Sequence, residues 1–329
     1  MTDSFQCLVV RSHSDGEHEC SLETREVDEL PPGDVLIRVR ASSLNYKDAL
    51  AASGHPGIVK SFPHVPGIDA WGEVLMSRDS RFVPGQEVLV TGHELGVERW
   101  GGWSEQIRVP AEWVLPLPVG LTGLECMQLG TAGFTAAQCV QALQRQGISP
   151  NRGPIAVTGA TGGVALISIM LLVKLGYEVV AITGKQDRAE WLRSLGAADV
   201  CGRDVLKISS RPLQSGKFAG GVDTVGGPML ASLIKQTNHR GCIACCGVAG
   251  GADLPLTVYP FILRGITLAG IDSAWCPMPE RQQIWNRLGS EWKLDLGSIC
   301  HTIPLAEAPR RAAEMLSGKT YGRTVIEIG

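Results

Sequence analysis

The sequence lacks both an excess of charge of one sign and a long hydrophobic run. Its 329 residues include 30 Lys and Arg against 33 Asp and Glu, which gives a formal net charge of −3. This charge provides no general attraction to nucleic acid or to an anionic membrane, so neither is an expected partner. The longest apolar run, residues 164–173 (VALISIMLLV), is about half of a bilayer span and ends at Lys174, and it predicts a buried helix.

Export signals and a disulfide framework are also missing. The N-terminal segment has no basic region followed by an apolar run, so we expect no secretory signal and a cytoplasmic location. Ten cysteines are present, but a chain of this size folds on a hydrophobic core without disulfides. Cys242 and Cys245 have the CxxC spacing of a zinc knuckle, yet no second pair or nearby histidine completes four ligands. The apolar, β-like run GCIACCGVAGG favours small buried thiols instead.

The first third of the chain predicts a β-rich domain. Its apolar or alternating segments lie between Gly and Pro turn signals, at residues 35–40, 66–74 and 85–92. Beyond about Leu124 the pattern changes, and strand-like runs alternate with helix-like runs. That alternation is typical of a parallel, doubly wound Rossmann-type sheet.

The helices and domain boundaries follow from this alternation. Helices are expected at 130–147, 162–175, 187–195, 228–238, 279–292 and 305–317. The last strand, at 322–329, is expected to return to the β-rich domain. The predicted fold class is α/β, with a β-rich domain of residues 1–125 completed by 274–329 and a Rossmann domain of residues 126–273.

The segment VTGATGGVALI, residues 157–167, has the position of a dinucleotide phosphate loop, after a strand and before a helix. Gly159, Gly162 and Gly163 allow the backbone to turn and approach a pyrophosphate at the helix N-terminus. The strict GxGxxG pattern is absent, and Ala165 occupies its third small position. The loop alone is a weak signal, but the strand–loop–helix context makes it a strong one.

The end of the next strand predicts which nicotinamide cofactor binds. An NAD site usually places Asp or Glu there to accept hydrogen bonds from the ribose 2′-hydroxyl. This chain has Thr183, Gly184 and Lys185 instead, and its first carboxylate is Asp187. A hydroxyl, a glycine and a cation suit the 2′-phosphate of NADPH, and Arg203 is a second cation able to reach that phosphate.

Several longer segments together resemble a known family. They are SSLNYKDAL (42–50), FPHVPGIDAWGEV (62–74), WGGWSEQ (100–106), GTAGFTA (130–136), VTGATGGV (157–164), GVDTVGG (221–227), PFILRGITLAGIDS (260–273) and GRT (322–324). In this order, over essentially the full chain, they resemble the YhdH/YhfP-type branch of the medium-chain dehydrogenase/reductase superfamily. Acrylyl-CoA reductase with NADPH is the best-defined activity of this branch, and many members carry a quinone oxidoreductase label.

The resemblance implies a GroES-like catalytic domain, a Rossmann domain, a homodimer and no metal. It implies NADPH contacts at Tyr46, Thr161, Gly162, Gly163, Val164, Thr183, Gly184, Lys185, Arg203, Val248, Ile262, Ser273 and Arg323. Two departures matter. Ala165 stands where the family commonly has Gly, and Lys185 stands where Arg is usual, which replaces a bidentate grip on the 2′-phosphate by a point charge.

The segment GHELG, residues 92–96, contains the GHE letters that help to hold catalytic zinc in alcohol dehydrogenases. In zinc-dependent relatives GHE falls at the segment that here is PGID (66–69), and a Cys ligand precedes it where this chain has SLNYKD. His93 and Glu94 come about 25 residues too late. We therefore expect no metal site at GHELG.

Without a metal, reduction of an activated C=C bond is a better expectation than alcohol oxidation. Hydride adds to the β-carbon of an α,β-unsaturated carbonyl, and the enolate oxygen then needs hydrogen-bond donors. Asn45 and Tyr46 are the candidate catalytic residues, while Asp48 and Asp69 are expected to cap turns or helices. Possible substrate contacts are Lys47, Lys60, Arg264 and Lys319 for CoA phosphates. Trp71, Trp103 and Phe134 are either contacts to the acyl group or, equally, core residues.

Three hypotheses remain open from the sequence. The leading one is NADPH-dependent reduction of a short enoyl-CoA, above all acryloyl-CoA to propanoyl-CoA. The second is NADPH-dependent reduction of quinones or free enones. The third is a non-catalytic NADPH-binding protein, against which the retained SLNYKD and the phosphate loop argue. The strand candidate RGITLAGI, residues 264–271, is expected to pair with its twofold mate in the dimer.

Overall fold

The computed structural model describes residues 4–13, 16–207 and 209–329. The chain divides into two compact units: unit 1 comprises Met1–Thr131 and Ala274–Gly329, and unit 2 comprises Ala132–Ser273. The first boundary lies beyond the predicted residue 125, inside helix α2 (Gly123–Arg145), where Gly130 has the non-helical angles φ 52° and ψ −157°. The run of small and apolar residues continues across this kink, so the sequence pattern does not reveal it.

Unit 1 is built on a seven-stranded sheet with the order β14-β15-β3-β4-β5-β7, and β6 pairs with β3 off this path. These strands are β3 (Val35–Ser43), β4 (Asp69–Ser77), β5 (Glu87–Thr91), β6 (Gln106–Val109), β7 (Leu115–Pro116), β14 (Cys300–Pro304) and β15 (Arg323–Glu327). The last strand pairs antiparallel with β3 and parallel with β14, which confirms its predicted return to the β-rich domain.

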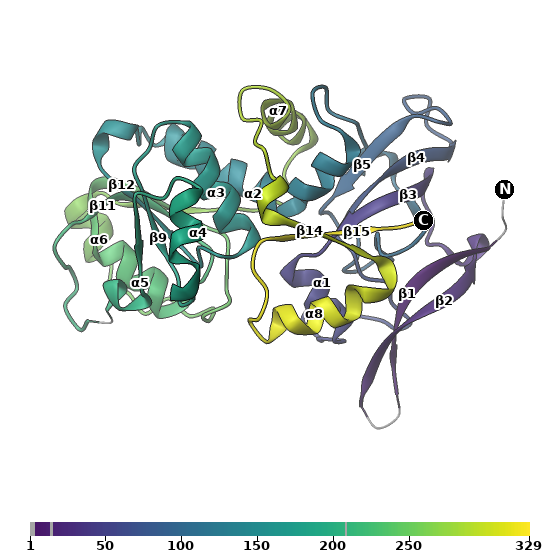
Figure 1. The fold of residues 1–329 in the computed structure, drawn as a ribbon, viewed down its shortest axis with the longest axis horizontal. Coiled ribbons are helices and arrows are strands. Elements are labelled where there is room, and N and C mark those ends of the chain that lie inside the picture. The colour runs from purple at the N-terminus through teal and green to yellow at the C-terminus, as the bar shows by residue number, and fades with distance from the viewer. Residues whose placement is uncertain (1–3, 14–15, 208) are drawn as a thin grey trace. The chain divides into compact units, whose positions relative to one another are not determined.

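Further elements of unit 1 surround this sheet (Figure 1). They are the antiparallel pair β1 (Ser4–Ser12) and β2 (His18–Glu26), and the helices α1 (Tyr46–Ala52), α7 (Met278–Leu288) and α8 (Ala308–Leu316). Helix α1 packs against α8. Side chains from β3, β4, β5, β6 and α8 form one buried core around Trp103 and Ile37.

Unit 2 contains a six-stranded sheet with the order β10-β9-β8-β11-β12-β13, in which every adjacent pair is parallel. The strands are β8 (Ile155–Thr158), β9 (Val179–Ile182), β10 (Asp199–Cys201), β11 (Phe218–Asp223), β12 (Thr237–Cys245) and β13 (Thr267–Gly270). Every residue of β8, β9 and β11 is buried, as expected for central parallel strands covered on both faces.

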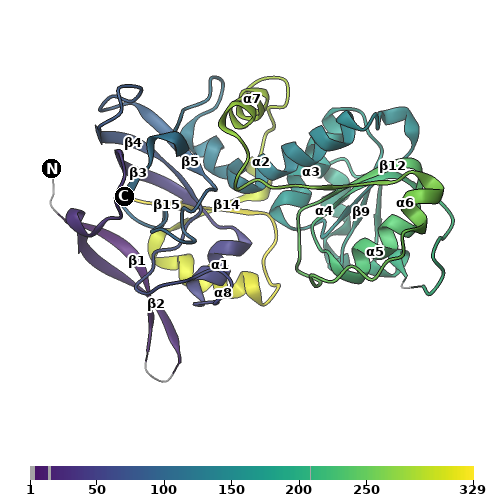
Figure 2. The same ribbon diagram turned by 180° about the vertical axis from the view of Figure 1, so that it is seen from behind.

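Helices α3 (Gly163–Lys174), α4 (Ala189–Ser194), α5 (Gly227–Lys235) and α6 (Tyr259–Arg264) pack on this sheet (Figures 1 and 2). The five helices predicted between 162 and 317, which begin near 162, 187, 228, 279 and 305, correspond to α3, α4, α5, α7 and α8. From β8 the chain moves through β9 to β10 on one side, and then from β11 through β12 to β13 on the other. The strand order therefore reverses between β8 and β11, where open α/β sheets bind ligands at the carboxyl ends of the strands.

Within the described residues, no helix is both long enough and apolar enough to cross a membrane. The apolar run at 164–173 lies in α3, most of whose side chains are buried in unit 2.

Candidate functional site

The loop after β8 leads directly into helix α3. Gly159 has φ +64°, a left-handed conformation that favours glycine, and its carbonyl accepts the N–H of Gly162 at 2.8 Å. Gly162 is the N-cap of α3 and supplies no side-chain cap. The N–H groups of the first helical turn have no intrahelical acceptor, so those of Gly163 and Val164 suit an anion. The four residues 161–164 assigned to the pyrophosphate lie together at this helix N-terminus.

Ala165, the departure from the family pattern, is fully buried. Its methyl group packs inside unit 2, where the small third residue of such loops allows helix and strand to pack closely.

The end of β9 brings together a hydroxyl, a glycine and two cations. Thr183 Oγ1 accepts the N–H of Lys185 at 3.0 Å. A methyl group on Gly184 would lie 2.8 Å from Nε and 2.9 Å from Cζ of Arg203. The Arg203 guanidinium therefore packs directly against the Gly184 backbone, and only glycine permits this approach. Residues 183–185 and Arg203, assigned from sequence to one cofactor phosphate, are neighbours.

The electrostatics at the end of β9 favour a bound anion. Burial lowers the pKa of Lys185 below its usual value; Arg188 and Arg203 also lower it, whereas Asp187 raises it. The Asp187 carboxylate pairs with Arg188 at 3.2 Å. Arg203 makes no ion pair with any residue that the structure describes. Two cations that repel each other gain stability when a phosphate binds between them.

Asp223 is a buried carboxylate of this region that the sequence analysis did not single out. It accepts hydrogen bonds from Thr158 Oγ1 at 2.8 Å and from the N–H of Gly226 at 2.7 Å. Burial raises the pKa of Asp223, and these hydrogen bonds oppose that rise. Asp223 thereby joins the carboxyl ends of β8 and β11 at the point where the strand order reverses. The segment GVDTVGG was quoted for the family resemblance, but nothing in it showed this contact.

The remaining cofactor residues assigned in unit 2 lie in the segments after β12 and β13. Val248 follows β12, Ile262 lies in α6, and both side chains are about two-thirds exposed, at 67% and 68%. Ser273 is half-buried at the end of the unit. Exposed apolar side chains such as Val248 and Ile262 are available to contact a flat ring.

In unit 1, the buried carboxylate of Asp69 holds distant segments together. It accepts hydrogen bonds from Ser43 Oγ at 2.5 Å, Asn45 Nδ2 at 2.8 Å and Thr131 Oγ1 at 2.6 Å. The N–H of Thr131 also donates to both carboxylate oxygens, at 3.0 and 2.9 Å. Asp69 therefore links the end of β3, the start of β4 and the N-cap of α1 to the second half of α2.

Arg323 completes this group, which we call the Asp69 cluster: Ser43, Asn45, Asp48, Asp69, Thr131 and Arg323. The guanidinium donates to the carbonyls of Gln128 at 2.9 Å and Leu44 at 3.1 Å, and to Asn45 Oδ1 at 3.1 Å. Burial lowers the pKa of Arg323, and the nearby Asp69 carboxylate opposes this effect. Arg323 was assigned from sequence to the cofactor, but its side chain is buried within unit 1.

Gly130 makes the Asp69 cluster sterically possible. A methyl group there would lie 2.5 Å from Asp69 Oδ2, 2.8 Å from Arg323 Nη2 and 2.8 Å from Ser43 Oγ. The positive φ of Gly130 and the kink in α2 thus allow the backbone to pass directly over the charged groups.

Asn45 and Tyr46, the candidate catalytic pair, have different environments. Asn45 is the N-cap of α1, and its Nδ2 lies within 3.1 Å of acceptors on Ser43, Asp48 and Asp69. Its amide is fully engaged in the cluster. Tyr46 begins α1 with 46% of its surface exposed, and its phenol bonds to no residue in the described part of the chain. The arrangement indicates a positioning role for Asn45 and leaves the phenol of Tyr46 able to donate.

The capping role predicted for the two carboxylates is confirmed. Asp48 accepts the N–H of Asn45 at 2.7 Å and forms a capping box with it, and it also accepts the N–H of Ile68 at 2.8 Å. Asp69 caps the second half of α2 through Thr131. Burial raises the pKa of Asp48 to about 7, and the negative charge of Asp69 adds to this rise.

The structure does not support several of the predicted substrate contacts. Trp103 and Phe134 are fully buried core residues, and Trp103 Nε1 donates to the Ser43 carbonyl at 3.3 Å. Arg264 uses its guanidinium to bind backbone carbonyls, those of Lys235 at 3.0 Å, Thr237 at 2.8 Å and Gln214. Trp103 and Phe134 are therefore core residues, one of the two alternatives that the sequence left open, and the Arg264 guanidinium is already engaged, because side-chain type alone does not distinguish a packing residue from a binding residue. Lys47, Lys60 and Lys319 are exposed.

His93 of the GHELG segment is a packing residue. Its ring stacks on Trp113 at a centroid distance of 5.2 Å and an interplanar angle of 1°, and Trp275 packs against it edge-on at 6.1 Å. The backbone N–H of His93 donates to the carbonyl of Ala274 at 3.0 Å. Burial, followed by the charge of Arg281, lowers the pKa of His93 to about 4.

The donor groups of the chain do not fit a zinc site. Zinc needs three or four His, Cys or carboxylate ligands, and no group of three or more such side chains within residues 4–13, 16–207 and 209–329 is placed to hold a metal ion. Cys242 and Cys245 are free thiols whose pKa values burial raises to about 11. No chemical step is therefore derived through zinc.

Two family models match the chain. One describes the alcohol dehydrogenase GroES-like domain and matches residues 31–119, and the other describes a zinc-binding dehydrogenase and matches residues 163–286. The first lies in unit 1, and the second lies mainly in unit 2. The second family model is named for zinc binding, but the His, Cys, Asp and Glu side chains in the described part of this chain do not fit a zinc site.

Full-length relatives are similar in both sequence and structure. The chain is 46% identical to the Probable acrylyl-CoA reductase AcuI of Escherichia coli, over 98% of this chain and 100% of that protein. It is 43% identical to the Putative quinone oxidoreductase YhfP of Bacillus subtilis, over 100% of both chains.

Two solved structures share the fold over nearly the whole chain. Escherichia coli YhdH with bound NADPH gives a TM-score of 0.95 at 45% identity, over 98% of this chain and 100% of that one. Bacillus subtilis YhfP with NAD bound gives a TM-score of 0.95 at 43% identity, over 99% of both chains.

Proposed function

Because the chain belongs to the YhdH/YhfP-type branch of the medium-chain dehydrogenase/reductase family, we propose that it reduces the C=C bond of acryloyl-CoA to give propanoyl-CoA, with NADPH as the reductant. Its relatives include the Probable acrylyl-CoA reductase AcuI at 46% identity, which supports an oxidoreductase acting on a short enoyl thioester. The observation in this chain that most supports NADPH over NADH is that two cations, Lys185 and Arg203, lie beside Gly184.

NADPH is the cofactor that the residues of unit 2 fit. The N-terminus of α3 suits the pyrophosphate, and Thr183, Gly184, Lys185 and Arg203 suit the 2′-phosphate. Val248, Ile262 and Ser273 are the proposed contacts to the rest of the cofactor. NAD is bound in the structure of YhfP, but Thr183, Gly184 and Lys185 at the end of β9, with Arg203 beside them, favour the phosphorylated form here.

When bound, NADPH supplies the hydride that adds to the β-carbon of the unsaturated thioester. The negative charge then collects on the thioester oxygen, and the phenol O–H of Tyr46 stabilises it by donating a hydrogen bond. Protonation of the resulting enolate at the α-carbon gives propanoyl-CoA. Asn45 and Arg323 position Tyr46, because Asn45 fixes the start of α1 and Arg323 donates to Asn45 Oδ1. The Asp69 cluster thus acts on the reaction through the orientation of one exposed tyrosine.

A second candidate is the reduction of a quinone or free enone by NADPH. It is supported by the name of the YhfP relative at 43% identity. Both candidates require the same hydride donor and the same hydrogen-bond donor to a developing oxyanion. They differ only in the molecule that accepts the hydride.

We also propose a homodimer formed through strand β13. This strand is the last in the six-stranded sheet and, among described residues, pairs only with β12. An unpaired strand edge is a template for a twofold mate. Analytical ultracentrifugation of wild type and Ala269→Pro tests this: we expect a dimer that dissociates in the variant, and a monomeric wild type would contradict it.

The proposed function is tested by following NADPH oxidation by EDTA-treated protein with acryloyl-CoA, crotonyl-CoA and a quinone, and with NADH replacing NADPH as the control. We expect turnover of acryloyl-CoA with NADPH. Turnover of the quinone without turnover of either thioester would establish the second candidate instead. Loss of activity with EDTA that zinc restores would contradict the metal-free account.

A further inference from the structure

The carboxylate of Asp223 holds the start of the segment that follows β11, at the carboxyl edge of the parallel sheet in unit 2. Its Oδ2 accepts the N–H groups of Gly226 at 2.7 Å and Val225 at 3.3 Å, and its Oδ1 accepts the Thr158 hydroxyl at 2.8 Å. These three partners are donors, so they fit the ionised carboxylate, which accepts on both oxygens. Asp223 is completely buried, so it acts through the backbone around it and not by touching a ligand.

Thr158 and Thr224 fasten the phosphate loop to this segment. Thr158 is the last residue of β8, and Gly159 follows it in the phosphate loop. The Thr158 hydroxyl accepts the N–H of Thr224 at 3.0 Å, and the Thr224 hydroxyl donates to the Thr158 carbonyl at 2.8 Å. A methyl group on Gly159 would overlap Thr224 Oγ1. The backbone of the phosphate loop therefore lies directly against the Thr224 side chain.

The segment that follows β12 packs against the same group of residues. The N–H of Cys246, the first residue after β12, donates to the carbonyl of Asp223 at 3.0 Å. A methyl group on Gly247 would overlap the carbonyl of Thr224, so the two backbones are in direct contact. The next residue is Val248, one of the proposed cofactor contacts. Its position is therefore tied to that of the phosphate loop through the segment after β11.

We propose that Asp223, Thr158 and Thr224 are positioning residues for the dinucleotide, because they fix the phosphate loop relative to the segment that carries Val248. The inference rests on the proposed cofactor site and names the residues that hold its backbone in place. A backbone that already has its bound arrangement loses less conformational entropy when the ligand binds, and this tightens binding. Loss of one of these hydrogen bonds should therefore weaken cofactor binding without removing a cofactor contact.

The expected loss is common to both reduced cofactors. The phosphate loop suits the pyrophosphate, which NADPH and NADH share, whereas Lys185 and Arg203 suit the 2′-phosphate, which NADH lacks. A displaced phosphate loop therefore weakens the binding of both cofactors by the same factor. At saturating cofactor the bound loop regains its arrangement, so the KM for the cofactor rises while kcat stays the same, as for binding that the ground state and the transition state share.

The test compares Thr224→Val with Thr224→Ser in the full-length protein. Valine has nearly the shape of threonine but no hydroxyl to donate to the Thr158 carbonyl, whereas serine keeps that hydroxyl. In a fluorescence titration, Thr224→Val should weaken the binding of NADPH and of NADH by about tenfold each, the equivalent of one hydrogen bond in the protein interior. Thr224→Ser should bind both cofactors with wild-type affinity. With acryloyl-CoA, the KM for NADPH should rise in Thr224→Val while kcat is unchanged.

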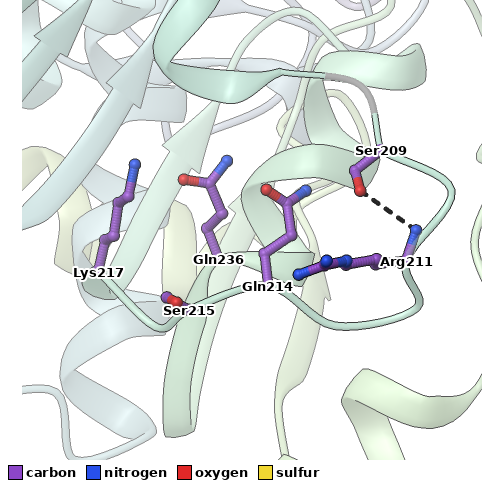
Figure 3. Close-up of a pocket in the computed structure, with 6 residues that line it drawn as sticks. All are labelled: Ser209, Arg211, Gln214, Ser215, Lys217 and Gln236. Carbon is purple, nitrogen blue, oxygen red and sulfur yellow. Dashed lines mark hydrogen bonds between the residues drawn. The ribbon is translucent and has the colours of Figure 1, made fainter.

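Thr237→Val is the matched control at the opposite edge of the sheet. The Thr237 hydroxyl also donates to a backbone carbonyl at 2.8 Å, that of Leu233, so the substitution removes a comparable hydrogen bond. Thr237 begins β12 at the amino-terminal edge, where its neighbour Gln236 and Lys217 line a surface pocket (Figure 3). Thr237→Val should leave the Kd and KM of both cofactors unchanged, even if it lowers the free energy of unfolding as much as Thr224→Val does.

The carboxylate itself is tested by Asp223→Asn, whose amide cannot accept hydrogen bonds on both sides. This variant should weaken both cofactors at least as much as Thr224→Val. Wild-type cofactor affinity in Asp223→Asn or in Thr224→Val, a loss confined to NADPH, a lower kcat with an unchanged KM, or an equal loss in Thr237→Val would each overturn the inference. A wild-type protein that binds neither cofactor would instead contradict the proposed function, and the inference with it.

Discussion

In unit 1, the carboxylates of Asp48 and Asp69 and the guanidinium of Arg323 are buried in one hydrogen-bonded cluster, whereas in unit 2 Lys185 and Arg203 are partly exposed cations that lie near each other, with Asp187 as the carboxylate that acts on Lys185. The first arrangement engages its charges mainly in hydrogen bonds within the chain, although Arg323 Nη2 has no partner among the described residues. In the second, Arg203 lowers the pKa of Lys185, and a ligand anion would relieve this repulsion. We propose from this comparison that the Asp69 cluster positions Tyr46, while the cations after β9 and β10 bind phosphate.

Removal of the central carboxylate is expected to have the largest effect. Asp69→Asn removes the buried carboxylate that accepts hydrogen bonds from Ser43, Asn45 and Thr131, and each lost hydrogen bond to a charged group costs about 1.5–3 kcal/mol. Chemical denaturation followed by tryptophan fluorescence measures the free energy of unfolding. Glu73→Gln is the control, since its ion pair with Arg40, at 3.1 Å, is about one-third exposed and contributes at most about 1 kcal/mol. Equal losses of unfolding free energy in the two variants would show that Asp69 does not stabilise the cluster.

Tyr46→Phe should preserve the fold and lower kcat with acryloyl-CoA by about 10²–10³-fold, the loss typical of one oxyanion donor. The free energy of unfolding should not change, because the phenol bonds to no described residue and the phenyl ring remains. Tyr259→Phe, which alters another half-exposed tyrosine, should retain wild-type kcat. A wild-type kcat in Tyr46→Phe would show that the phenol takes no part in the reaction, and that the Asp69 cluster does not act on the reaction by positioning it.

The raised pKa of Asp48 predicts a pH dependence of stability. Its pKa is about 7 in the folded protein against about 3.9 for a free aspartate side chain, so the folded state binds the proton more tightly. The contribution of Asp48 protonation to the free energy of unfolding is fully present below about pH 4 and is lost as the pH rises through about 7. Each unit of pKa difference corresponds to about 1.4 kcal/mol. Unfolding free energies measured from pH 4 to 8 should lose this component in Asp48→Asn. An identical profile in wild type and variant would show that Asp48 titrates normally.

Comparing the stability of Gly130→Ala with that of Gly147→Ala distinguishes a steric clash in the Asp69 cluster from backbone strain. Both glycines have positive φ, 52° and 71°, but an added methyl meets Asp69 and Arg323 at Gly130 and meets nothing within 4 Å at Gly147. Strain at each costs about 1–3 kcal/mol, and the loss at Gly130 should exceed that at Gly147 by about 1–3 kcal/mol. Thermal unfolding of the two variants measures the difference, and equal shifts in Tm would contradict the close packing over Asp69.

Much of the fold was predictable because local patterns determine it. The alternation of apolar strands and helices predicted the parallel sheet, and the predicted helix at 162–175 corresponds to α3 (Gly163–Lys174). The phosphate loop, Lys185 and Arg203 could be assigned because each follows the carboxyl end of a predicted strand, and all such ends lie at one edge of a parallel sheet.

The Asp69 cluster could not be assembled from sequence. Ser43, Asp69, Thr131 and Arg323 are far apart along the chain, and only the pairing of β15 with β3 and the kink at Gly130 bring them together. The roles of Arg264 and Trp103 stayed open from sequence for the related reason that their environment depends on tertiary contacts. A sequence pattern shows which residues follow a strand, but it does not show which buried polar groups form hydrogen bonds with one another.

The most direct test of the comparison is the affinity for NADPH and NADH of wild type and of the double variant Lys185→Met/Arg203→Met, measured by fluorescence titration. The account predicts that the double variant loses about 10²-fold or more in NADPH affinity while its NADH affinity remains near that of wild type, because two charge-assisted contacts to the 2′-phosphate are removed. An equal loss for both cofactors, or no loss for NADPH, would contradict it.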